Sequence, residues 1–152
     1  MNDASVGQFW GLARRARPEL PVEVPEAWAF GATPEQADEL LALVLDGAKT
    51  GTASSLWDVE AESEEVPEVG EMSIILDGRD RPRAVIETTA VETVPFDEVT
   101  AEHAWAEGEG DRSLAAWRDI HERFWRGHGL GPRGFSRGMP VVCERFALVF
   151  VS

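Results

Sequence analysis

The chain has 152 residues, of which 43% are hydrophobic and 28% charged, and its net charge at pH 7 is −14. This length fits one domain over residues 1–152 with a substantial core. The negative charge argues against a long polynucleotide partner, because phosphate neutralisation needs a basic face. No apolar run approaches the roughly 18 residues of a membrane span, and one cysteine excludes an internal disulfide and a cysteine-based zinc cluster. The expectation is a cytoplasmic, intracellular protein without membrane contact, metal or cofactor.

The first third of the chain predicts two helices joined by an extended segment. Apolar residues recur at helical spacing within residues 5–16, which predicts an N-terminal helix. Three prolines in "RPELPVEVPEAWAFG" favour an irregular, extended connection. The second helix is predicted over residues 33–46, because Thr33 suits an N-cap, Gln36 completes a capping box and Gly47 suits the stop.

After this second helix the pattern is mostly that of strands. β-branched and aromatic residues are enriched in four segments, and two helical segments precede the last of them. The strands are expected at 51–58, 71–77, 82–94 and 140–151, and the helices at 97–107 and 113–127, with Ser113 as an N-cap. The acidic run from Asp58 to Glu71 contains no basic residue and is interpreted as a solvated loop. These elements predict an α+β fold with a small sheet.

The segment "LDGAKTGTASS" contains Lys49, the only lysine among 14 basic residues. One interpretation is electrostatic: a cation just after a helix C-terminus interacts favourably with the helix dipole, by roughly 0.3–1 kcal/mol. Arginine would serve equally well there, and the rest of the chain uses arginine. The other interpretation is chemical, because a lysine amine is compact and changes its protonation state when it is desolvated.

Thr52 follows Lys49 by three residues, and this spacing decides whether the two side chains can cooperate. In a regular strand they would point to opposite faces, so a shared site needs a turn or bulge, which Gly51 permits. A hydroxyl beside an amine is the arrangement of an activated nucleophile. The alternative is a turn in which Thr52, Ser54 and Ser55 cap backbone groups.

The acidic candidates lie in "HAWAEGEGDRS", between the two predicted helices. Glu107 falls at a helix C-terminus, where the dipole disfavours a carboxylate, so another group such as Lys49 is expected to hold it. Glu109 lies two residues later between glycines that free the chain, and a small loop shift would exchange the two carboxylates. The acidic partner of Lys49 is therefore Glu107 or Glu109.

The remaining chemistry-bearing residues are interpreted mainly as structural. The three histidines lack the spacing of a metal site, and His103 and His121 are assigned to helix surface or packing. Most of the six tryptophans are assigned to the core, with Trp28 and Trp57 as candidates for stacking on a base. Cys143 lies in an apolar strand and is assigned to the core.

Four segments and their order carry a family resemblance. The chain contains the G-x-K-x-x-T pattern in "GAKTGT", then "VGEMSIILDG", then "AEGEGDRSL" followed by a tryptophan, and finally "PVVCERFALVF". Over about residues 9–150 this order resembles the ASCH domain superfamily, and in particular its YhfF-like bacterial branch. The resemblance implies a PUA-like fold: a small β-barrel with helices around its rim and a cleft beside the G-x-K-x-x-T segment.

The resemblance also implies candidate functions. ASCH domains have been regarded as RNA-binding modules, some small bacterial members are amidohydrolases that deacylate N4-acetylcytidine, and at least one other is a ribonuclease. Carried over by position, the amidohydrolase residues are Lys49, Thr52 and Glu107. Thr52 would attack the acyl carbonyl. Lys49 would act as base and acid, or would stay charged and stabilise the oxyanion while Glu107 accepts the proton.

This chain is longer than the compact amidohydrolases, and the additions bear on the ligand. A loop over residues 127–139 is rich in arginine and glycine. Its Arg133, Ser136 and Arg137 are candidates for substrate binding, with the arginines as a phosphate clamp or as solvated side chains. Ser54 and Glu109 are further candidates for substrate binding. The leading hypothesis is deacylation of an N4-acylated cytidine-like nucleoside or base. The alternatives are a non-enzymatic module that binds RNA or a nucleotide, and a ribonuclease.

Overall fold

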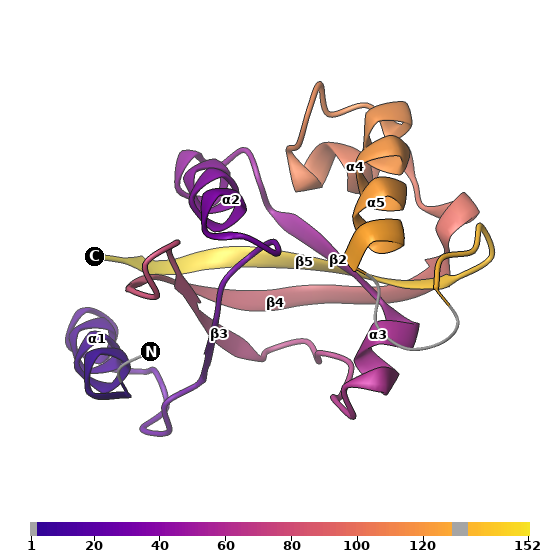
Figure 1. Ribbon diagram of the computed structural model, residues 1–152. Coiled ribbons are helices and arrows are strands. Elements are labelled where there is room, and N and C mark those ends of the chain that lie inside the picture. Colours follow the sequence, from indigo (N-terminus) through magenta and orange to yellow (C-terminus); the bar gives the residue numbers. More distant parts are fainter. Residues whose placement is uncertain (1–2, 129–133) are drawn as a thin grey trace.

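A computed structural model of the protein describes residues 3–128 and 134–152 (Figure 1). In chain order, its elements are α1 (Asp3–Ala16), β1 (Glu26–Trp28), α2 (Pro34–Asp46), β2 (Gly51–Ser55), α3 (Leu56–Ala61), β3 (Met72–Leu76), β4 (Pro82–Pro95), the short 3₁₀ helix η1 (Phe96–Glu98), α4 (Ala101–Glu107), α5 (Leu114–His128) and β5 (Pro140–Val151). Helices and strands of one sheet thus form an α+β fold. Among the described residues, no helix combines the length and the apolar character that a membrane crossing requires.

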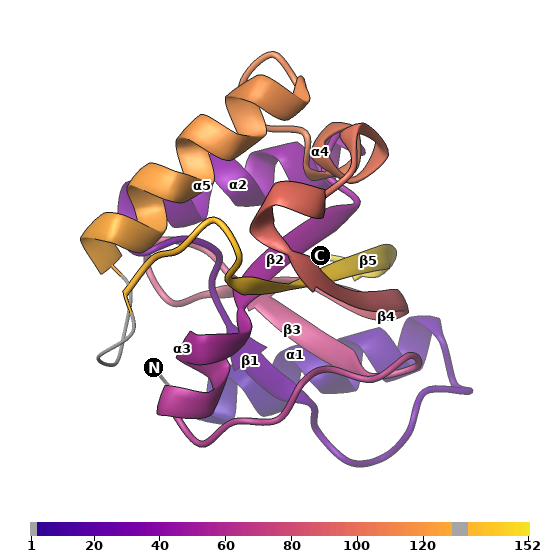
Figure 2. The same ribbon diagram turned by 90° about the vertical axis from the view of Figure 1, so that its right-hand side faces the viewer.

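The five strands form one mixed sheet in the order β1-β3-β4-β5-β2. β1 runs parallel to β3, and the other neighbouring pairs are antiparallel. The two long strands β4 and β5 pair along most of their length, with register shifts between Val85 and Ile86 and between Thr88 and Ala90. Such irregularities bend a strand and increase its twist, and the sheet is accordingly curved (Figure 2).

Helices cover both faces of this sheet. α2, α4 and α5 lie on one side, and α1 lies on the other (Figures 1 and 2). The alternation of β3 explains how one strand contacts two layers: Ile74 packs with the α1 residues, whereas Ile75 packs with the α2 residues. A third apolar cluster joins α5 to β5 through Trp117 and Val141.

The helix ends follow the local signals in the sequence. Thr33 Oγ1 accepts a hydrogen bond from Gln36 N at 3.1 Å, and Ser113 Oγ accepts one from Ala116 N at 3.0 Å. Gly47 ends α2 in the left-handed conformation with φ of 83°, which a residue without a side chain adopts freely. The predicted caps of the second and last helices are therefore confirmed.

Three segments differ from the sequence-based expectation. The proline-rich connection contains β1, because its last residues gain a partner in β3 that no local pattern reveals. The strand predicted to end at residue 58 ends at Ser55, whose side chain caps α3 by accepting from Asp58 N at 3.4 Å. The helix predicted over 97–107 is split into η1 and α4, because Thr100 starts a new helix by accepting from His103 N at 3.1 Å.

Candidate functional site

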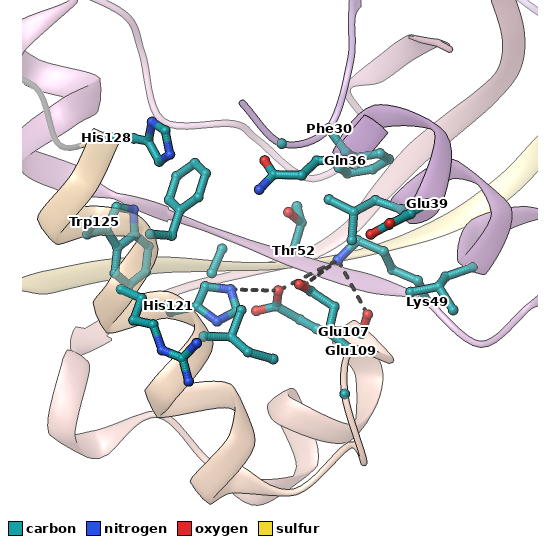
Figure 3. A pocket seen from close by; sticks show the side chains of 18 residues that line it. Phe30, Gln36, Glu39, Lys49, Thr52, Glu107, Glu109, His121, Trp125 and His128 are labelled. Atoms are coloured by element: carbon teal, nitrogen blue, oxygen red, sulfur yellow. Dashed lines mark hydrogen bonds and ion pairs between the residues drawn. The ribbon is translucent and has the colours of Figure 1, made fainter. Parts of the chain in front are cut away.

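A cavity of about 530 Å³ is enclosed by helices α2 and α5, by strand β2 and by the loop that follows α4. Figure 3 shows four side chains converging in it: Lys49, Thr52, Glu107 and Glu109. Its walls combine these polar groups with aromatic rings, and the other lining residues used below are Phe30, Gln36, Glu39, His121, Arg123, Phe124 and Trp125. A mostly apolar pocket with a few converging polar groups is the usual form of a small-molecule site.

Lys49 reaches the cavity because it precedes β2. The turn after α2 is held by Leu43, whose carbonyl accepts from the backbone amides of both Ala48 and Lys49 at 3.0 Å. β2 then pairs with β5 in continuous register from Gly51 to Ser55. The prediction that Lys49 and Thr52 need a turn or bulge at Gly51 is therefore wrong. The chain turns before the strand begins, and the regular strand places Thr52 at the same cavity as Lys49.

Two glycines are needed because backbones approach closely around Lys49. A Cβ atom on Gly51 would lie 3.1 Å from the carbonyl oxygen of Glu144. A Cβ atom on Gly108 would lie only 2.6 Å from the carbonyl oxygen of Ala48, and Gly108 also has φ of 74°. The glycines therefore let the end of α4 pack directly against the segment that carries Lys49.

The Lys49 ammonium is buried between two carboxylates. The side chain is 1% exposed, and its Nζ lies 3.4 Å from Glu109 Oε2 and 3.6 Å from Glu107 Oε1. Nζ also donates to the backbone carbonyl of Glu107 at 3.4 Å and lies 5.4 Å from the centre of the Phe30 ring. The lysine singled out in the sequence thus contacts both of the carboxylates between which the sequence could not choose.

Glu107 is surrounded by donors. Its Oε2 accepts from Trp117 Nε1 at 2.6 Å and from His103 Nε2 at 2.7 Å, while Oε1 lies 3.2 Å from His121 Nε2. Burial alone, the largest single effect, would raise the pKa of Glu107. The charge of His121, the hydrogen bonds from His103 and His121, and the charge of Lys49 together hold this pKa well below its ordinary value of 4.5. Glu107 is therefore a fixed anion.

His103 and Glu107 lie one helical turn apart on α4. Arg145 Nε donates to His103 Nδ1 at 3.4 Å, so Nδ1 is the acceptor and Nε2 carries the proton. Nε2–H is then the group that donates to Glu107. Arg145 thus selects the tautomer that His103 needs to hold the carboxylate.

Glu109 and Thr52 are the more accessible members of the site. The Glu109 side chain is 18% exposed, compared with 1% for Glu107. Thr52 is partly buried, and among the described residues its hydroxyl forms no hydrogen bond. A ligand in the cavity would therefore find the Thr52 hydroxyl and the Glu109 carboxylate available, whereas Glu107 is fully engaged.

The arrangement of donors also bears on metal binding. Glu107, Glu109 and His121 offer three potential ligand atoms within 4.8 Å of one another. The His121 ring is engaged at both nitrogens, by the Trp117 carbonyl and by Glu107. The Lys49 ammonium already lies between the two carboxylates, where it balances negative charge that would otherwise attract a cation.

The other predicted site residues that the structure describes lie outside this cavity. Trp28 packs edge-on against Phe30 at 4.8 Å, and Trp57 packs against the apolar cluster of α5 and β5. Ser54 and Ser136 are exposed, and Arg137 is exposed and paired with Asp97 at 3.4 Å. Arg133 lies outside the described residues.

Sequence analysis missed the functional placement of three residues. The core placement of Trp117 and the packing interpretation of His103 and His121 agree with their burial. What the sequence did not indicate is that all three contact Glu107. A signal was present: His103 and Glu107 are four residues apart in one predicted helix, and so are Trp117 and His121 in the next. Residues four apart share a helix face, but nothing local indicated that the two faces meet.

Comparison with known proteins identifies the family. The family model of the ASCH domain matches residues 26–150. A crystal structure of a protein from Enterococcus faecalis V583, assigned to the DUF984 family, is 35% identical with a TM-score of 0.85, and the match covers 97% of this chain and 90% of that chain. The crystal structure of an ASCH domain from Lactobacillus crispatus JV V101 is 28% identical with a TM-score of 0.86, and the match covers 98% and 96%.

No curated protein matches the chain. The family model spans most of the sequence, and the similar structures extend over nearly the whole fold. The predicted PUA-like α+β fold is confirmed by these structures together with the mixed, curved sheet described above. The chain belongs to the ASCH domain family.

Proposed function

We propose that this protein is an amidohydrolase that removes the acyl group from an N4-acylated cytidine-like nucleoside or base. One observation carries the proposal: a buried amine, a free hydroxyl and an accessible carboxylate, from Lys49, Thr52 and Glu109, line one cavity. An amine next to a hydroxyl is the basis of nucleophilic catalysis by threonine or serine. The residue types also match those expected from the family resemblance, with Glu109 joining Glu107 at the amine.

The cavity suits an uncharged, flat ligand. Its volume of about 530 Å³ is within the range of about 300–1,000 Å³ found for small-molecule sites. Aromatic side chains of Phe30, Phe124 and Trp125 form part of the wall, and Gln36 offers an amide that can both donate and accept. Arg123 lines the cavity, but its guanidinium is ion-paired with Asp119. These features favour a nucleoside or base over a phosphate-bearing nucleotide.

The proton route begins at the Lys49–Glu109 pair. When an uncharged ligand displaces water from this pair, the ion pair loses solvation, and transfer of a proton from Nζ to Glu109 leaves a neutral amine. Glu107 does not serve as the proton acceptor, because both of its carboxylate oxygens are already occupied. Oε2 accepts hydrogen bonds from His103 and Trp117, and Oε1 is ion-paired with His121 and Lys49. The structure therefore favours Lys49 as the base of the reaction and Glu107 as its fixed support.

The chemical step then proceeds through an acyl-enzyme. Thr52 Oγ1 attacks the acyl carbon while its proton passes to Lys49 Nζ. The bond from the acyl carbon to the exocyclic nitrogen breaks, and Nζ returns the proton to that nitrogen, which leaves as the free amine. Water then attacks the acyl carbon of the threonine ester while Lys49 Nζ takes a proton from it. The bond from the acyl carbon to Thr52 Oγ1 breaks and Nζ returns the proton to Oγ1, which releases the carboxylic acid and restores the Thr52 hydroxyl.

The proposal is tested by hydrolysis of N4-acetylcytidine, followed through the absorbance change to cytidine. Wild-type protein is expected to turn over, and Thr52→Ala and Lys49→Arg are each expected to lose at least about 100-fold in kcat/KM. Thr50→Ala is the matched control, since this exposed hydroxyl on the same segment faces a different cavity. Absence of wild-type turnover would reject the function, and full activity of Thr52→Ala would reject the nucleophile.

Binding of RNA or a nucleotide remains the competing function, and the arginines bear on it. Arg126 is paired with Glu122 at 2.8 Å and Arg137 with Asp97 at 3.4 Å, so both charges are partly neutralised. A nucleoside site predicts binding that is nearly independent of salt, whereas phosphate contacts predict a steep loss of affinity with rising salt. Titration of cytidine, its 5′-monophosphate and a short RNA at two salt concentrations separates these functions, and the ribonuclease alternative predicts cleavage of the RNA.

A further inference from the structure

We propose that His121 is a buried imidazolium whose positive charge balances Glu107, so that Lys49 remains free to give up its proton at the active site. His121 acts here as a positioning residue rather than as a catalytic one. The second half of the inference rests on the proposed function, because it concerns the amine that would serve Thr52. The first half concerns only the protonation of the folded protein.

The hydrogen bonds of the ring carry the first half. His121 Nδ1 lies 2.8 Å from the backbone carbonyl of Trp117, and a carbonyl only accepts, so Nδ1 carries a proton. His121 Nε2 lies 3.2 Å from Glu107 Oε1, and an unprotonated nitrogen there would turn its lone pair toward a carboxylate. Both nitrogens therefore carry protons, which makes the ring a cation.

Packing fixes the ring in this orientation. His121 is 8% exposed and stacks on Trp117 with ring centres 4.2 Å apart and an interplanar angle of 18°. The Trp125 ring also lies beside the His121 ring, with ring centres 5.3 Å apart and an interplanar angle of 53°. A cation over the face of an indole is favourable, and the fixed ring cannot turn its nitrogens away from Glu107.

The charges around the ring are nearly balanced. Glu107 and Glu109 contribute two negative charges, and Lys49 and His121 contribute two positive ones, while His103 donates to Glu107 as a neutral ring. Glu39 also lines the cavity, and Cys143 lies within the electrostatic reach of Glu107 but is neutral, since burial raises the pKa of its thiol to about 12. The direction for His121 agrees: burial would lower its pKa, but the charge and hydrogen bond of Glu107 raise it.

Removal of the imidazolium would favour the protonated form of the Lys49 amine. Without His121⁺, the ammonium would be the only cation facing two carboxylates, and each carboxylate favours the protonated amine. The neutral amine would then form only at higher pH. A carboxylate beside Lys49 favours the protonated amine, whereas a base must be neutral. The positive charge of His121 balances Glu107 and thereby lets the Lys49 amine act as a base.

The first experiment reads the protonation of each histidine directly. In uniformly ¹⁵N-labelled full-length protein, two-bond ¹H–¹⁵N correlation spectra distinguish an imidazolium from each neutral tautomer. At pH 7.5, His121 is expected to give the pattern with both nitrogens protonated, and His103 the neutral pattern with the proton on Nε2. A neutral His121 at this pH would overturn the inference whether or not the protein is an amidohydrolase.

The second experiment uses the fact that Lys49 is the only lysine. Protein labelled with [ε-¹³C]lysine has a single labelled side chain, so its titration is read without assignment. In His121→Gln, which keeps a donor toward Glu107 but removes the charge, the Lys49 titration is expected to move to higher pH by about one unit or more. Glu122→Gln on the same helix, paired with the exposed Arg126, is the control and should leave it unchanged.

Kinetics connect this result to the proposed function. In His121→Gln, the pH at which kcat/KM rises should move in the same direction as the Lys49 titration. A purely structural loss would instead lower kcat/KM at all pH values without moving the pH at which it rises. An unmoved lysine titration would overturn the role assigned to His121. A moved titration in a protein that does not deacylate would support the charge relation and reject only the proposed function.

Discussion

Glu107 and Glu144 are both buried carboxylates, 1% and 9% exposed, but they lie in opposite electrostatic surroundings. Glu107 at the end of α4 contacts two histidines, a tryptophan and a lysine. Within residues 3–128 and 134–152, Glu144 in β5 has one hydrogen-bond donor, the Thr88 hydroxyl at 2.9 Å, and the nearby charge of Glu71 repels it. Burial raises the pKa of Glu144, whereas the donors around Glu107 overcome the same burial and hold its pKa well below the ordinary value.

This difference teaches that burial alone does not make a functional acid. A desolvated carboxylate is neutralised unless donors and cations replace the lost water. The α4–α5 region supplies such donors to Glu107, whereas between β4 and β5 the Thr88 hydroxyl alone does not offset the burial of Glu144, and the pKa of Glu144 is raised. The predictions below alter one carboxylate or its partners and compare the results.

The largest effect is expected from Glu107→Gln. The substitution keeps the volume but removes the charge, so Lys49 and His121 would face a neutral amide that cannot balance them. Leaving one partner of a buried ion pair uncompensated costs about 3–5 kcal/mol. Urea unfolding at pH 7 measures this loss, and Glu102→Gln on the exposed face of α4 is the control. Equal stability of the two variants would contradict the importance assigned to Glu107.

A second prediction concerns the pH dependence of wild-type stability. The folded-state pKa of Glu107 is lowered, so its contribution to stability is fully present above the unfolded value near 4.5 and is lost as pH falls through the folded value. The folded-state pKa of His121 is raised, so its contribution is present below about 6.5 and is lost as pH rises through the folded value. The unfolding free energy of the wild type should therefore fall at low pH, where Glu107 is protonated, and at high pH, where His121 is deprotonated. In Glu107→Gln both of these decreases should be smaller.

An intermediate effect is expected from Trp117→Phe. Phenylalanine keeps an aromatic ring against His121 but removes the Nε1–H that donates to Glu107 Oε2 at 2.6 Å. Loss of one hydrogen bond to a buried charged group costs about 1.5–3 kcal/mol. Trp125→Phe is the matched control, since it removes similar area from the same apolar cluster without touching Glu107. Similar losses in the two variants would attribute the effect to packing alone.

Much of the fold could be predicted from local sequence. Thr33, Gly47 and Ser113 mark helix ends through groups within three residues, and the runs of β-branched residues mark the long strands β4 and β5. The short elements were missed because their partners are distant. β1 exists through pairing with β3, and α3 begins where Ser55 turns its hydroxyl to the Asp58 amide.

The candidate site was only partly predictable for the same reason. The unusual lysine, the hydroxyl three residues later and the pair of acids drew attention to Lys49, Thr52, Glu107 and Glu109. What the sequence could not supply was the approach of α5 to α4, which gives Glu107 its contact with His121. Residues 107 and 121 lie on different helices, and no local rule relates their faces.

The smallest effect, and one of opposite sign, is expected from Glu144→Gln. The raised folded-state pKa of Glu144 means that its protonated form stabilises the fold below the unfolded value, and that this contribution is lost as pH rises through the folded value. At pH 7 the carboxylate is therefore unfavourable. A neutral amide can still accept from Thr88, so the variant should be more stable than wild type by about 1 kcal/mol at pH 7 and nearly equal at pH 4. Urea unfolding at both pH values measures this difference, and destabilisation at pH 7 would mean that Glu144, like Glu107, is held as a needed anion.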